Sequence, residues 1–298
     1  MNYKWNGMET KFAVKTPKEF MEQKTGNSAE INLFFLACLN TQAIEAYPVL
    51  LSTRENGKIK VDYPFLSFFD YTMVAVKTKD QYLLVDATNI FLPYDKIPIS
   101  CINESGLLVK KNANEWVNLG STDHGSSIFE YITISVNPDS DSLSCMFRIV
   151  SNGYDAASMK ERTGIKYEKI KEDLISRGLN PEDSIKIINF IDRKEDYILE
   201  FTCNQEFNRI ENKIVISPFF QEAEQENKLK SPSRKYPVDF IYKMNRQFEV
   251  SIKIPEGFKV SYLPPDFSMN NNLVNILYSS KTENGILTIT GKYAIFTV

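Results

Sequence analysis

Side chains that could act as nucleophiles or as general bases are few in this chain of 298 residues. Four cysteines occur at positions 38, 101, 145 and 203, and His124 is the single histidine. No two cysteines have the Cys-x-x-Cys spacing of zinc ribbons and thioredoxin-like redox pairs, and one imidazole excludes His-Glu-x-x-His zinc sites. A Cys or Ser nucleophile would therefore have His124 as its only imidazole base.

Cofactor binding and nucleic-acid binding are not indicated either. The 12 glycines include no Gly-x-Gly-x-x-Gly and no Gly-x-x-x-x-Gly-Lys-Ser/Thr motif, so the two commonest phosphate-binding loops are absent. Lys and Arg number 35 against 38 Asp and Glu, and the net charge of −3 argues against a nucleic-acid partner. We expect no cofactor, no metal and no nucleic acid.

The candidate nucleophiles and the histidine also have ordinary structural interpretations. We interpret the four cysteines as free thiols in or near a core, and Cys38 in particular as a core residue of an apolar helix rather than a relocated nucleophile. His124 lies in the Gly/Ser-rich segment 120–127, which is typical of a linker, and we interpret it as an exposed loop residue.

The first 120 residues have the pattern of an α+β domain. Asn27 is a good helix N-cap, and Glu30, three residues later, completes a capping box. The helix body, 31–39, is apolar almost all the way round, which is typical of a helix buried on most faces. Three strands would pack on this helix as an antiparallel sheet. They are predicted over 47–53, 72–78 and 82–88.

Residues 121–298 predict a second domain, a mainly antiparallel β-sandwich with a small helical insert near 154–178. Phe248 to Ile254 alternate apolar and polar residues, and the alternation resumes from Phe258 to Tyr262 before two prolines. A period of two has one buried face, so each run predicts a strand. Further strands are predicted over 128–136, 143–150, 184–191, 196–203, 213–217, 273–279 and 286–296.

Membrane insertion and secretion have no signal in this sequence. The longest apolar run, 31–39, is far shorter than the roughly 20 residues that a membrane span needs. The opening residues lack the charged stub and apolar stretch of a secretory signal. As written, the chain is expected in the cytoplasm; as part of a longer exported protein it would be periplasmic or on the cell surface.

Several segments, taken in order, resemble the transglutaminase-like superfamily. They are Gly26–Leu33, Ile44–Arg54, Phe69–Val76 and Tyr82–Thr88. The resemblance is especially to bacterial transglutaminase-like proteins of the Bacteroidetes type, through Leu92–Asn103, Arg234–Phe240 and Pro255–Phe258. It runs from about residue 3 to residue 296. It implies a transglutaminase-like (papain-like) core of the α+β class followed by a β domain.

The resemblance also implies a site. In that superfamily a Cys opens the buried helix, a His starts the next strand and an Asp ends the strand after it. The matching positions here hold Ser28, Tyr71 and Asp86. A tyrosine of pKa about 10 is roughly 0.1% ionised at pH 7, and a neighbouring carboxylate raises that pKa further. The trio is therefore predicted to be a degenerate and inactive triad, in which Tyr71 donates a hydrogen bond to Asp86.

The same three residues have separate interpretations without the resemblance. Ser28 is then the first helical residue after its cap, Tyr71 is a core aromatic residue, and Asp86 caps a turn at a strand end.

These observations predict a non-catalytic transglutaminase-like binding or scaffold protein, whose groove between helix 27–39 and the sheet holds a peptide, protein or glycan. Two alternatives stay open. One is an active cysteine-protease-like or transglutaminase-like amidase or acyltransferase that uses other groups. The other is a structural piece of a larger exported protein. His124 or a carboxylate within hydrogen-bond reach of Ser28 or a cysteine, in a cleft, would favour the enzyme.

Overall fold

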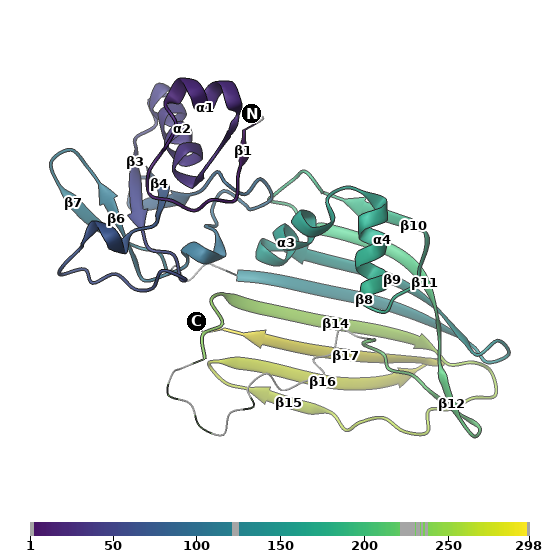
Figure 1. Cartoon of the computed structure of the whole chain (residues 1–298). Helices are drawn as coiled ribbons and strands as arrows, with labels where there is room; N and C mark the ends of the chain where they lie inside the picture. Colours follow the sequence, from purple (N-terminus) through teal and green to yellow (C-terminus); the bar gives the residue numbers. More distant parts are fainter. Residues whose placement is uncertain are drawn as a thin grey trace. The chain divides into compact units, whose positions relative to one another are not determined.

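The computed structural model describes residues 3–120, 125–220 and 238–296, together with the single positions 230, 233 and 235. The chain divides into two compact units, Met1–His124 and Gly125–Val298, and each unit has its own main sheet (Figure 1). Parts of two predicted features lie outside the described residues: 121–124 of the linker, which include His124, and Arg234, Tyr236 and Pro237 of the C-terminal motif.

The first unit is a five-stranded antiparallel sheet with one long helix packed on it. Its elements are β1 (Lys4–Trp5), α1 (Pro17–Gln23), β2 (Thr25–Gly26), α2 (Ser28–Thr41), β3 (Ala46–Leu51), the 3-10 turn Leu66–Phe68, β4 (Tyr71–Lys77), β5 (Tyr82–Val85), the 3-10 turn Ile99–Cys101, β6 (Ser105–Val109) and β7 (Asn114–Asn118). The strand order is β5-β4-β3-β6-β7, and β1 and β2 form a separate parallel pair.

Helix α2 begins where the sequence predicts it. The Asn27 side chain accepts a hydrogen bond from the Glu30 backbone N–H at 2.8 Å, and the Glu30 carboxylate accepts one from the Asn27 N–H at 3.0 Å. This reciprocal pair is the predicted capping box, and it satisfies two of the N–H groups that a helix start leaves open. Three apolar side chains further along α2, Phe35, Leu36 and Leu39, pack on the sheet.

The second unit is built on one sheet of eight strands. Its elements are β8 (Gly125–Asn137), β9 (Ser142–Asn152), α3 (Gly153–Thr163), α4 (Tyr167–Ser176), β10 (Pro181–Ile188), β11 (Tyr197–Glu206), β12 (Asn208–Ile210), β13 (Lys213–Val215), β14 (Lys243–Lys253), β15 (Phe267–Asn270), β16 (Val274–Glu283) and β17 (Ile286–Ile295). The order is β10-β11-β9-β8-β14-β17-β16-β15. All neighbours are antiparallel except β8 and β14, which are parallel.

The predicted β-sandwich is wrong. Within the described part of this unit, the strands form that single sheet and the small hairpin β12–β13, and no second large sheet covers the core face. Ile170 and Leu174 of α4 belong to the same apolar cluster as the inward side chains of the strands. In Figure 1, α3 and α4 lie over the β8 to β11 half of the sheet. The alternating pattern identifies the buried face of a strand but not the layer that covers it.

Of three other predictions in this unit, two are confirmed and one is wrong. Phe248, Val250 and Ile252 are buried on the core face, as the period of two requires. The run from Phe258 to Tyr262 is not a strand, because it joins no sheet. The helical insert near 154–178 is present as the two helices α3 and α4.

Candidate functional site

Two of the three predicted site residues are in direct contact at one end of the first sheet. Tyr71 is the first residue of β4, and Asp86 follows the last residue of β5, the strand paired with β4. The Tyr71 hydroxyl donates a hydrogen bond to Asp86 Oδ2 at 2.9 Å. The Tyr71 side chain is buried, being 1% exposed, so its hydroxyl has no access to a bulk-solvent base.

Both oxygens of the Asp86 carboxylate are occupied by donors. Oδ2 accepts from Tyr71 and from the Asn32 side-chain amide at 2.7 Å. Oδ1 accepts from the Thr88 backbone N–H at 2.9 Å and from the Thr88 hydroxyl. Four hydrogen bonds converge on one carboxylate, so each of its oxygens is already engaged as an acceptor.

Asn32 is the member of this cluster that sequence reasoning missed. It lies one helical turn after Ser28, is fully buried, and interrupts an otherwise apolar helix. Besides its bond to Asp86, its amide donates to the Thr72 carbonyl at 3.0 Å and accepts from the Ala87 N–H at 2.9 Å. A polar residue on the buried face of a helix was the available signal, because such a residue requires partners.

Burial dominates the proton affinities in this cluster. It raises the pKa of Tyr71 well above its usual value, and the charge of Asp86 adds to that shift. Burial also raises the pKa of Asp86, although hydrogen bonds from Thr88, Asn32 and Tyr71 oppose the rise. The nearby Cys101 thiol is fully buried, and burial followed by the charge of Asp86 raises its pKa well above normal. Tyr71 and Cys101 therefore both keep their protons at neutral pH.

Ser28, the third predicted site residue, has different partners. Its hydroxyl donates to the Thr10 carbonyl at 3.0 Å and accepts from the Thr10 N–H at 2.9 Å. Its own backbone N–H donates to the Met8 carbonyl at 3.0 Å, and the residue is fully buried. Among the described residues, no hydrogen bond connects Ser28 to Tyr71 or Asp86.

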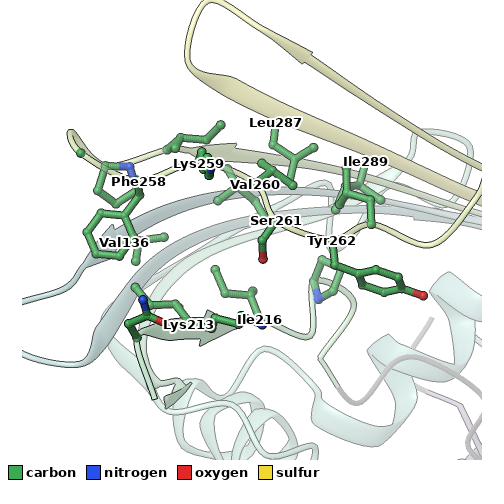
Figure 2. A pocket seen from close by; sticks show the side chains of 18 residues that line it. Val136, Lys213, Ile216, Phe258, Lys259, Val260, Ser261, Tyr262, Leu287 and Ile289 are labelled. Atoms are coloured by element: carbon green, nitrogen blue, oxygen red, sulfur yellow. The ribbon is translucent and has the colours of Figure 1, made fainter. Parts of the chain in front are cut away.

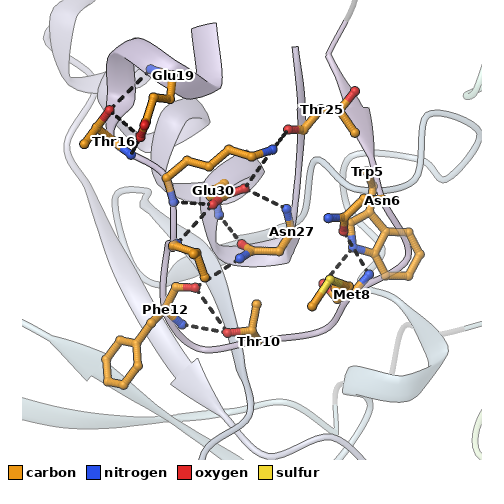
Figure 3. A network of polar contacts seen from close by, with 12 residues as sticks. Trp5, Asn6, Met8, Thr10, Phe12, Thr16, Glu19, Thr25, Asn27 and Glu30 are labelled. Atoms are coloured by element: carbon orange, nitrogen blue, oxygen red, sulfur yellow. Dashed lines mark hydrogen bonds and ion pairs between the residues drawn. The ribbon is translucent and has the colours of Figure 1, made fainter. Parts of the chain in front are cut away.

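The partners of Ser28 belong to residues 8–15, here called the N-terminal strap. This segment has no helix or strand, and its backbone is hydrogen-bonded to the first residues of α2. Figure 3 shows how the strap is held. Asn27 donates from its side chain to the Phe12 carbonyl at 3.2 Å. Glu30 accepts from the backbone N–H groups of Val14 at 3.0 Å and Lys15 at 2.7 Å. The capping residues of α2 therefore bind the strap as well as the helix.

The strap also contacts the sheet. The Thr72 hydroxyl donates to the Lys11 carbonyl at 2.8 Å, and the Lys11 ammonium donates to the Phe69 carbonyl at 2.7 Å. Burial alone would raise the pKa of Glu30, but the hydrogen bonds from Lys15, Asn27 and Val14 lower it overall. An ionised Glu30 thus forms the anchor of the strap.

Family and fold comparisons add to this geometry. Residues 212–296 match the family described as "Domain of Unknown Function with solved-structure structure (DUF3858)". This match covers β13 to β17 of the second unit. No match was found among curated proteins.

The fold has a solved counterpart. The crystal structure of a protein from Parabacteroides distasonis, described as "a putative protease", superposes with a TM-score of 0.51 at 8% sequence identity. The superposition covers 99% of this chain and 43% of that one, so this chain spans less than half of the solved protein. At this identity the likeness shows the fold alone. The family match and the fold are compatible with a transglutaminase-like fold.

The cysteines at 38, 145 and 203 lie apart from the Asp86 cluster, in other parts of the described structure. Cys38 lies in α2 and is half-buried, and Cys145 and Cys203 are buried opposite each other on β9 and β11. Across the ranges that the structure describes, no three His, Cys, Asp or Glu side chains are grouped closely enough to hold a metal ion. No described helix is long and apolar enough to cross a bilayer.

Proposed function

We propose that this chain is a non-catalytic protein of transglutaminase-like fold, and that its first unit acts as a scaffold or binding module. The observation that supports this most directly is the state of Ser28. Its hydroxyl is buried, donates its proton to the Thr10 carbonyl and accepts a hydrogen bond from the Thr10 N–H. A nucleophile must reach a substrate carbonyl and lose a proton to a nearby base. The buried Ser28 hydroxyl is hydrogen-bonded only to Thr10 among the described residues, and none of its partners there is a base.

The groups around Ser28 support the same proposal. Acyl transfer needs a group near pKa 7 that accepts the nucleophile's proton. Tyr71 stands at the expected position of that base, and its pKa is shifted further from neutrality by burial and by Asp86. Asp86 already accepts four hydrogen bonds. No group in the cluster is free to accept a proton.

The start of helix α2 is also covered. Free N–H groups at a helix start stabilise a thiolate or an oxyanion in catalytic sites. Here the Ser28 N–H is bonded to the Met8 carbonyl, and the Glu30 N–H is bonded to the Asn27 side chain. We infer that the residues at the triad positions fasten the N-terminal strap and join α2 to β4 and β5, instead of performing chemistry.

Activity assays on the full chain test this proposal. Amide hydrolysis and amine transfer are measured with a casein substrate, and Ser28 labelling is measured with a fluorophosphonate probe. We expect no labelling of Ser28 and turnover equal to that of Ser28→Ala. Turnover that Ser28→Ala abolishes, in a variant whose tryptophan fluorescence shows an intact first unit, would overturn the proposal and favour the enzyme alternative.

A cysteine at position 28 tests whether the N-terminal strap shields this position from reagents. Cys38 is half-buried, whereas residue 28 is fully buried under the strap. In Ser28→Cys we expect iodoacetamide to modify Cys38 faster than the new thiol, as read by peptide mass spectrometry. Faster modification of the new thiol would show an accessible and activated position, which contradicts the proposal.

A further inference from the structure

The second unit contains a groove of about 580 Å³ on the core face of its sheet. This volume is typical of ligand sites, which hold roughly 300–1,000 Å³. Ile252, Leu287 and Ile289, all buried, form its floor. Figure 2 shows Lys213 and Ile216, from the hairpin and the residue after it, on one side, and the segment Phe258–Tyr262 on the other.

The rim segment 258–262 has the sequence of a strand but no strand partner. Its apolar residues occupy every second position, and they stay exposed: Phe258 by 39%, Val260 by 37% and Tyr262 by 77%. The Phe258 N–H bonds to Pro255, within the preceding turn. From residue 259 to residue 263, no backbone group bonds to another described residue. An alternating segment with open backbone groups is a vacant position for strand pairing.

The opposite rim is a second open edge. β13 pairs with β12 on one side, with Ile210 opposite Lys213. Within the described residues, this pair is a two-stranded sheet with no third strand. The groove therefore runs between two backbone edges above an apolar floor, which is the arrangement that binds extended peptides by strand addition.

Charge specifies the occupant further. Lys213 and Lys259 are the charged side chains that line the groove, one on each rim. Neither forms an ion pair with any described residue. Acidic side chains on an occupant would complement both ammonium groups, and such complementarity selects between partners.

We propose that this groove binds an extended peptide by strand addition along residues 258–262. Alternate apolar side chains of the peptide lie on the floor, and its flanking acidic residues reach Lys213 and Lys259. This inference goes beyond the proposed function of the first unit and does not depend on the chemical state of Ser28. Nearly all of the groove lies within the residues matched by the DUF3858 family.

Binding is tested on the full chain with two fluorescein-labelled peptides of the same composition. Glu-Val-Thr-Val-Thr-Val-Glu alternates its valines, and Glu-Val-Val-Val-Thr-Thr-Glu groups them. We expect saturable anisotropy changes with the alternating peptide and about tenfold weaker binding of the grouped one, because the grouped valines cannot all face the floor. Hydrogen exchange should slow at 258–263 and at 213–216 when the alternating peptide binds.

Proline substitutions separate strand pairing from simple apolar contact. Successive N–H groups of an extended segment point to opposite sides, so one of Val260→Pro and Ser261→Pro removes a donor that faces the groove. We expect one of the two variants to bind about tenfold more weakly and the other to bind normally. Neither substitution removes a hydrogen bond of the free protein, because neither N–H has a described partner.

Charge reversal supplies the matched control. Lys213→Glu and Lys259→Glu should each weaken binding of the alternating peptide. Lys169→Glu, at an exposed position on α4, should leave that binding unchanged.

Three outcomes would overturn the proposal: equal binding of the two peptides, binding of dodecanoate without binding of either peptide, or self-association of the chain that a proline at 260 or 261 abolishes. The last would assign the groove to a second copy. None of these results bears on the Ser28 assays, so each proposal can be overturned without the other.

Discussion

The polar cluster of the first unit and the groove of the second unit differ in how their hydrogen-bonding groups are used. Around Asp86 and Ser28, the carboxylate, the hydroxyls and the N–H groups of Ser28 and Glu30 are bonded to other residues of the same chain. Along 259–263, the backbone groups bond to no other described residue. The first region therefore contributes to folding, and we infer that the second is available to a partner.

This difference bears on how function is read from a fold. The cluster lies where the superfamily resemblance places catalysis, yet Ser28, Tyr71 and Asn32 are buried, and the half-buried Asp86 accepts four hydrogen bonds. The groove lies in a segment that resembles no catalytic motif. Backbone groups without a partner in the chain, next to an apolar surface, are more informative here than the position that the resemblance assigns, because a bound partner can pair with groups that the free chain leaves open.

Removal of the Asp86 carboxylate should have the largest effect on stability. Asp86→Ala leaves the Tyr71, Asn32 and Thr88 donors without their acceptor in a buried place. We expect a loss of about 3 kcal/mol in the free energy of unfolding. Trp5 and Trp116 are the two tryptophans, and both lie in the first unit, so their fluorescence in a urea titration reports on that unit alone.

The matched control for this change is Asp80→Ala. Asp80 is exposed in the turn before β5, and its removal should change the unfolding free energy by less than about 0.5 kcal/mol. Equal effects of the two substitutions would contradict a structural role for the cluster.

Loss of the Tyr71 hydroxyl should cost less, because three donors to Asp86 remain. We expect Tyr71→Phe to lower the unfolding free energy by about 2 kcal/mol at pH 7. The folded-state pKa of Tyr71 is raised, so its contribution is complete below the unfolded pKa of about 10 and is lost as pH rises through the folded value. Urea midpoints at pH 7, 9 and 10.5 should therefore fall more steeply in the wild type than in Tyr71→Phe. Parallel pH profiles would show that Tyr71 ionises freely in the folded state.

The two capping boxes of the first unit offer a smaller and matched comparison. Asn27 and Glu30 cap α2 and hold the strap, whereas Thr16 and Glu19 cap α1 in an exposed place. We expect Asn27→Ala to cost about 1 kcal/mol, and Thr16→Ala to cost less.

Low pH should weaken the anchoring of the strap by Glu30. The folded-state pKa of Glu30 is lowered, so its contribution is present above the unfolded pKa of about 4.3 and is lost as pH falls through the folded value. Between pH 6 and 3, the unfolding free energy measured by tryptophan fluorescence should fall less in Glu30→Gln than in Glu19→Gln. An identical acid limb in both variants would contradict the role of Glu30 as anchor.

Local signals in the sequence predicted α2 and the strands β3, β4 and β5, but not β6 and β7, which complete the five-stranded sheet. The Asn27–Glu30 capping box and the apolar run after it placed α2, because both depend on neighbours within one helical turn. The expected contact between Tyr71 and Asp86 came from the resemblance, which assigned the two positions to adjacent strands. The partner of Ser28 was not predictable in this way. Thr10 is 18 residues away in a segment without periodicity, and its backbone, not its side chain, makes the bonds.

The errors in the second unit have a common physical origin. The alternation correctly predicted the burial of Phe248, Val250 and Ile252, because it follows from the pleat of a single strand. It could not show whether helices or a second sheet cover that face, because either layer buries the same side chains. It also could not show whether the run at Phe258 finds a neighbour to pair with, because pairing depends on residues far away in the chain.

The smallest effect is expected at the rim of the groove, and it completes the comparison between the two regions. Phe258→Ser and Val260→Ser remove half-exposed side chains from a segment that pairs with no strand, so we expect changes below about 0.5 kcal/mol in the unfolding free energy. Ile132→Val, which trims a buried side chain of the same unit, is the reference and should cost about 1 kcal/mol. Cys145 and Cys203 are buried in this unit, so pulse labelling of their thiols in a urea series measures its unfolding separately from the tryptophan signal. If the rim substitutions cost as much as Ile132→Val, these apolar residues serve folding, and their exposure no longer supports a docking role. If the rim substitutions leave the unfolding free energy unchanged and weaken binding of the alternating peptide, the two side chains act in binding and not in folding.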